Sequence, residues 1–116
     1  MVTGSPLTHT NLTDLEERLL DKARESSSRR AAETLYGGRD AVLRQTAMAL
    51  LDEAELPEHD SPPEATLQVL SGHLRLTGQG RSWELSAGDI MPIPPERHSV
   101  LAREDSFFLL TVRRSV

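Results

Sequence analysis

The feature that most constrains the fold is a series of short β-favouring runs in the second half of the chain, each ended by turn residues. The runs are Thr66–Leu70, Leu74–Thr77, Arg81–Leu85, Ile90–Ile93, Ser99–Ala102 and Phe107–Val112. Gly78-Gln79-Gly80 is typical of a β-hairpin, and Ala87-Gly88-Asp89 marks a further turn. Because no helical pattern lies between the runs, the sequence predicts an antiparallel sandwich or barrel.

Two segments upstream extend this pattern. Arg30–Tyr36 is predicted to be a short strand that ends at the glycine pair 37–38. Ala41–Leu51 has high helix propensity, but the alternation of its side chains and the strands that follow favour a strand. Its inward-facing set stays open: either Arg44, Thr46 and Met48, or Gln45 and Ala47, face the interior. The acidic run 52–55 that follows predicts a solvated loop, and the segment around His59 is rich in turn residues.

The region 11–28 has helical periodicity instead. Its apolar stripe consists of Leu12, Leu15, Leu19, Leu20 and Ala23. The helix begins either with a capping box formed by Thr13 and Glu16 or with Asn11 as the cap. We expect the stripe to pack on the rest of the domain or on a second subunit, and residues 1–10 to form a flexible tail.

Composition narrows the class of protein. The chain has 116 residues, 37% hydrophobic and 27% charged, which suits one soluble domain. It has no cysteine, which excludes disulfides, thiolate zinc sites and iron–sulfur clusters. A net charge of −5 argues against a nucleic-acid partner, and no apolar run approaches the roughly 20 residues of a membrane span. The N-terminus lacks a signal-peptide pattern, so we expect a cytoplasmic protein.

The order of three segments is more specific than any one of them. VLSGHLRLTG at 69–78, LSAGDIMPIPPERHSV at 85–100 and AREDSFFLLTV at 102–112 follow one another along the chain. Together they resemble the cupin superfamily, over about residues 40–116. The resemblance implies a mainly β fold, a small antiparallel jelly-roll barrel of the RmlC-like type. We expect this barrel domain to span residues 30–116, with the N-terminal helix outside the region of resemblance.

The resemblance also implies a metal motif, which this chain carries in incomplete form. In metal-binding cupins two histidines, one residue apart, precede a glutamate that lies seven residues before a glycine. When the pattern is anchored on Gly72, the histidine positions are His59 and Ser61, and Ala65 stands at the glutamate position. The second motif supplies one further histidine, His98.

The implied metal ligands are therefore His59 and His98 alone. Two neutral imidazoles hold an ion weakly, because structural and catalytic sites normally take three or more protein ligands. We expect no tightly held cofactor. A divalent transition metal completed by water, Glu64 or Asp60 is the alternative.

The interior of the barrel is the expected ligand pocket. The candidate lining residues are His59, Ser61, Ala65, Leu67, His98 and Val100. Such a pocket would be mostly apolar with two imidazoles, which suits a small molecule that is partly apolar or anionic.

Three functions follow from this reading. The first is a barrel that binds a small molecule without a metal. The second is a metal-dependent cupin enzyme, an oxygenase or isomerase acting on a small acid or sugar. The third is a homodimeric interaction or regulatory domain. The residues do not decide whether the chain is an enzyme.

Overall fold

The computed structural model describes residues 7–59 and 64–114. One helix precedes nine strands: α1 (Leu12–Glu25), β1 (Arg30–Tyr36), β2 (Leu43–Leu50), β3 (Glu55–His59), β4 (Glu64–Ser71), β5 (His73–Gly78), β6 (Arg81–Ser86), β7 (Ile90–Pro92), β8 (His98–Ala102) and β9 (Ser106–Arg113). The expected mainly β fold with an N-terminal helix is confirmed. The strand prediction for 41–51 is also confirmed, since β2 lies within it.

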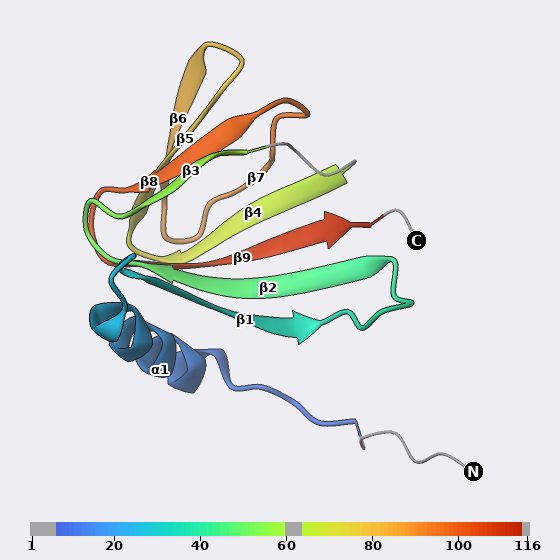
Figure 1. Cartoon of the computed structure of the whole chain (residues 1–116). Helices are drawn as coiled ribbons and strands as arrows, with labels where there is room; N and C mark the ends of the chain where they lie inside the picture. Colours follow the sequence, from blue (N-terminus) through green and yellow to red (C-terminus); the bar gives the residue numbers. More distant parts are fainter. Residues whose placement is uncertain (1–6, 60–63, 115–116) are drawn as a thin grey trace.

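The strands form two antiparallel sheets that face each other (Figure 1). One sheet has the order β1-β2-β9-β4-β7, and the other has the order β3-β8-β5-β6. The inward side chains of both sheets make one apolar core, in which Phe108, Leu67, Leu74 and Leu76 are fully buried. The alternation seen in the sequence is what builds this core, because every second residue of a strand points to the same face.

The predicted hairpin between β5 and β6 forms, and its loop has two residues. Gly78 pairs with Arg81, which leaves Gln79 and Gly80 as the loop. Their φ angles are 58° and 69°. Two successive residues with positive φ match the right-handed twist of the flanking strands, as in a type I′ turn.

Strand β3 was predicted to be loop, and that prediction is wrong. Its sequence contains Pro57 among charged residues, which lowers its strand signal. The strand nevertheless forms at the edge of the four-stranded sheet, where a missing N–H costs no ladder bond on the open side. It pairs with β8, with a register irregularity between Leu56 and His59.

Helix α1 lies against the outer face of β1 and β2 (Figure 1). Leu15, Leu19 and Ala23 are fully buried there. The cap is Asn11, whose Oδ1 accepts the N–H of Asp14 at 2.9 Å, so the capping-box alternative is not used. The helix ends at Glu25, three residues before the predicted end. The apolar stripe therefore packs on the chain's own sheet rather than remaining open for a partner.

Within the residues described, no helix is long and apolar enough to cross a membrane.

Candidate functional site

A cavity of ≈ 90 Å³ lies between the two sheets. It is lined by Leu56, Ala65, Ile93, His98, Val100, Leu110 and Val112. Larger hollows of ≈ 520 and ≈ 310 Å³ lie along α1, but they are open to solvent and lined mostly by charged side chains. An apolar cavity with one polar group is the more typical ligand site, so we take the interior cavity as the candidate.

Among the described residues, His98 is the one polar side chain in the wall of this cavity. It begins β8 and is only 3% exposed. Its Nδ1 lies 3.0 Å from the carbonyl oxygen of Glu96. A carbonyl can only accept, so Nδ1 carries a proton and donates it to this oxygen. The backbone of its own loop thus sets the orientation of the ring.

The neighbouring strand leaves room for His98. Gly78 of β5 is its cross-strand partner. A Cβ on that glycine would lie 3.2 Å from the His98 Cβ, closer than an ordinary contact. Gly78, the last residue of β5 before the hairpin loop, therefore also leaves space beside His98.

The residues predicted for the pocket have different positions in the structure. Ala65, His98 and Val100 line the cavity, whereas Leu67 is fully buried in the core. The backbone of His59 pairs with that of His98 at the end of β3. Ser61, the His59 side chain and the possible ligand Asp60 lie outside what the structure describes.

Sequence reasoning did not name four of the lining residues. These are Leu56, Ile93, Leu110 and Val112. The last two alternate along β9 and could have been found by extending the period-2 pattern. Leu56 could not, because its strand was assigned to a loop.

The inward register of β2 is now settled. Ala47 and Ala49 pack in the cluster under α1, whereas Leu50 and Met48 pack in the core between the sheets. By alternation, Arg44 and Thr46 therefore also lie on the barrel side of β2. This is the first of the two alternative inward-facing sets given by the sequence. The Nε of Arg44 is buried and has no hydrogen-bond partner within the described part of the chain.

The described side chains of the cavity wall offer a metal ion a single ligand, His98. Apart from His98, every lining residue of the cavity is aliphatic. No group of three or more His, Cys, Asp or Glu suited to a metal occurs among residues 7–59 and 64–114. One imidazole among the described side chains falls short of the three protein ligands of a catalytic ion, and the side chains of His59 and Asp60 lie outside the described residues, so we derive no chemistry through a metal.

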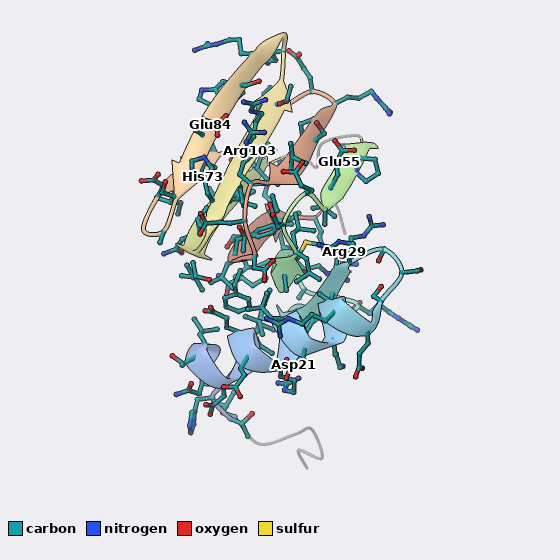
Figure 2. The ribbon with its side chains drawn as sticks, turned by 90° about the vertical axis from the view of Figure 1, so that its left-hand side faces the viewer. Asp21, Arg29, Glu55, His73, Glu84 and Arg103 are labelled. Carbon is teal, nitrogen blue, oxygen red and sulfur yellow. The ribbon has the colours of Figure 1, made fainter. Side chains whose placement is uncertain are left out.

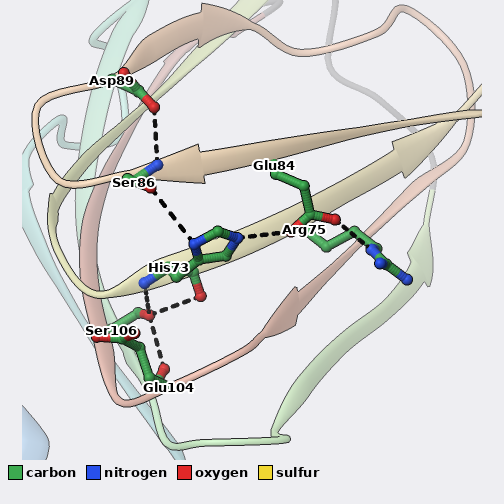
Figure 3. Close-up of polar contacts among 7 residues, drawn as sticks. All are labelled: His73, Arg75, Glu84, Ser86, Asp89, Glu104 and Ser106. Atoms are coloured by element: carbon green, nitrogen blue, oxygen red, sulfur yellow. Dashed lines mark hydrogen bonds and ion pairs between the residues drawn. The ribbon is translucent and has the colours of Figure 1, made fainter.

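A second polar group lies on the outer face of the β5–β6 hairpin (Figures 2 and 3). The Nε2 of His73 and the Nε of Arg75 each contact a different carboxylate oxygen of Glu84, both at 2.6 Å. These contacts, Arg75 first, lower the pKa of Glu84 below its usual 4.5. The Ser86 hydroxyl lies 3.4 Å from His73 Nδ1, too long for an activated nucleophile. The cluster therefore links strands β5 and β6 through side-chain contacts.

Comparison with known proteins supports the fold. No protein-family model matches the sequence, and no curated protein resembles it at a significant level. A conserved protein of unknown function from Streptococcus pyogenes is 23% identical, with a TM-score of 0.69 over 100% of this chain and 97% of that one.

Two further solved structures are described as cupins. A cupin superfamily protein from Desulfitobacterium hafniense is 13% identical, with a TM-score of 0.68 over 74% of this chain and 78% of that one. An RmlC-like cupin from Shewanella frigidimarina is 20% identical, with a TM-score of 0.65 over 74% and 77%. These likenesses show that the chain has the cupin fold.

Proposed function

We propose that this chain binds a small, mainly apolar molecule inside its barrel, without a tightly held metal. The observation that carries the proposal is the cavity of ≈ 90 Å³ with six aliphatic residues and His98 in its wall. The aliphatic walls favour hydrocarbon, and His98 adds one buried polar group beside them.

The size of the cavity limits the ligand. A volume of ≈ 90 Å³ holds about three water-sized groups, since water occupies roughly 30 Å³ each in the liquid. The ligand therefore places a short aliphatic segment in the cavity. Its polar end projects from the cavity.

A cavity-filling substitution tests the proposal. Short-chain alcohols, amides and carboxylates are screened for a saturable rise in Tm, because a ligand that binds only the folded state must stabilise it. Ala65→Leu places a larger side chain in the cavity wall, and Ala87→Leu makes the same change at an exposed turn. We expect at least one compound to raise the Tm of the wild type and of Ala87→Leu, but not of Ala65→Leu. The absence of any saturable shift at millimolar concentrations would contradict the proposal.

We also propose that the chain forms a homodimer in the cytoplasm. The supporting observation is β1, a seven-residue edge strand without proline. Its inward-side residues Ala32 and Thr34 are exposed, and Tyr36, beyond a register irregularity, is 58% exposed. Natural edge strands are usually shortened, charged or covered, and pairing with a second copy would cover this one.

A further inference from the structure

Arg44 lies on the barrel side of β2, and its buried Nε has no hydrogen-bond partner among the described residues. We propose that Arg44 recognises the anionic end of the ligand, and that the ligand is a short-chain monocarboxylate whose aliphatic tail enters the cavity. This inference rests on the proposed small-molecule function and gives it a substrate class.

Strand register places Arg44 beside the cavity. It pairs with Val112 of β9, and Val112 pairs on its other side with Ala65 of β4. Val112 and Ala65 both line the cavity. Residues paired across neighbouring strands point to the same face, so Arg44 continues this row by one strand on the barrel side.

The guanidinium of Arg44 lacks the partners that the other arginines at this end of the sheet have. Arg113 is paired with Glu64, and Arg114 donates to the carbonyl oxygens of Gly38 and Ala41. Arg44 has no ion pair among the described residues, and its buried Nε–H has no acceptor there. A buried donor on a charged group is costly to leave unpaired, which favours an acceptor supplied from outside the described chain.

A carboxylate is the acceptor that fits best. The planar guanidinium presents N–H groups in a fixed fork that matches the two carboxylate oxygens. Among the described residues, no acidic side chain lines the cavity. The aliphatic wall receives a tail of only a few carbons, as the volume requires. Propionate and butyrate have both parts.

The test compares butyrate with butyramide, a neutral molecule of nearly the same shape, by calorimetry or NMR titration. Four proteins are used: the wild type, Arg44→Met, Arg44→Lys, and Arg39→Met as a control that removes an exposed arginine from the nearby turn. Circular dichroism and Tm confirm that each variant is folded.

We expect the wild type to bind butyrate at least about tenfold more tightly than butyramide, as charge-assisted hydrogen bonds require. Arg44→Met should remove that preference and leave butyramide affinity unchanged. Arg44→Lys should keep part of the preference, and Arg39→Met should keep all of it.

The contrary outcomes separate this inference from the proposed function. Equal affinity of the wild type for butyrate and butyramide, both lost in Ala65→Leu, would overturn the carboxylate assignment alone. A preference for butyrate that survives Arg44→Met would show that another group recognises the anion. If neither compound nor any other small molecule binds the wild type, the proposed function fails as well.

Discussion

Gly72 shows how a single residue fixes the end of the barrel. It lies between β4 and β5 with a φ of +92°, a conformation that L side chains rarely adopt. A Cβ at this position would also collide with the Ser106 hydroxyl and would lie 2.5 Å from the Asp105 carbonyl oxygen. That hydroxyl accepts the N–H of His73 at 3.0 Å and donates to neighbouring carbonyl groups. Both the backbone and the packing therefore require glycine here.

Gly72→Ala should lower the free energy of unfolding by about 3 kcal/mol or more, because backbone strain adds to a steric clash. Gly88→Ala is the matched control, since Gly88 has a φ of +95° but no atom within 4 Å of an added Cβ. It should cost only about 1 kcal/mol. Urea unfolding measures both values. Equal losses would show that packing around Gly72 adds nothing to the strain.

At the scale of single site residues, motif spacing predicted more than composition did. His98, Ala65 and Val100 were named from the sequence, and all three lie in the cavity wall. Arg44 was named only as a member of one of the two alternative inward-facing sets of β2. The register of β2 depends on which face meets α1, and that contact between distant segments is not encoded in the local pattern of the strand.

Among the elements, the β5–β6 hairpin depends on charge as well as on its turn. Glu84 on β6 is held by Arg75 and His73 on β5 (Figure 3). Because these contacts lower the pKa of Glu84, the folded state binds its proton less readily than the unfolded state. The stabilisation is therefore full above the unfolded pKa, and it is lost as the pH falls through the lower, folded pKa.

Glu84→Gln should reduce the free energy of unfolding by about 0.5 kcal/mol at neutral pH, a typical value for an exposed cross-strand pair. The deficit relative to the wild type should vanish in strongly acidic solution, where the wild-type carboxylate is also protonated. Glu104→Gln, which removes the same charge from an exposed loop, should show little deficit. Urea unfolding over a pH series provides the comparison. A Glu84→Gln deficit that does not change with pH would contradict the electrostatic explanation.

Some strands could be predicted from their sequence patterns and others could not. Strands with one buried face, such as β5 and β9, carry a strong period-2 signal. Strand β3 carries Pro57 and lies at an edge, so its pairing with β8 rather than its own sequence holds it in place. The helix start was narrowed to two caps, but both caps satisfy the same rule and only the structure distinguishes them.

On the scale of the whole molecule, the two faces of strand β1 are not covered equally. Helix α1 covers the outer face of β1 and β2, whereas the barrel-side residues of β1 stay exposed. The outer edge of β1 pairs with no other strand among those described. A symmetric partner could cover both the edge and the exposed residues.

Light scattering or sedimentation should show a dimer at micromolar concentrations. Thr34→Lys should shift the equilibrium toward the monomer, because two symmetry-related charges would meet at a β1–β1 junction. Thr77→Lys makes the same change on an exposed part of β5 and should leave the mass unchanged. A wild type that remains monomeric at high concentration would rule out this dimer.

The cupin fold by itself does not specify a function, because similar barrels host unrelated activities. The described residues of this barrel provide a buried histidine, an aliphatic cavity wall and a neighbouring arginine. The central claim is that this interior binds a small molecule.

NMR titration of isotopically labelled protein with butyrate tests that claim most directly, because it locates binding residue by residue. We expect saturable shifts at Ala65, His98, Val100 and Val112, with little change on the outer face of β5 and β6. Shifts confined to the outer face of α1, or no saturable shifts with butyrate, butyramide or the other short-chain compounds, would contradict the claim.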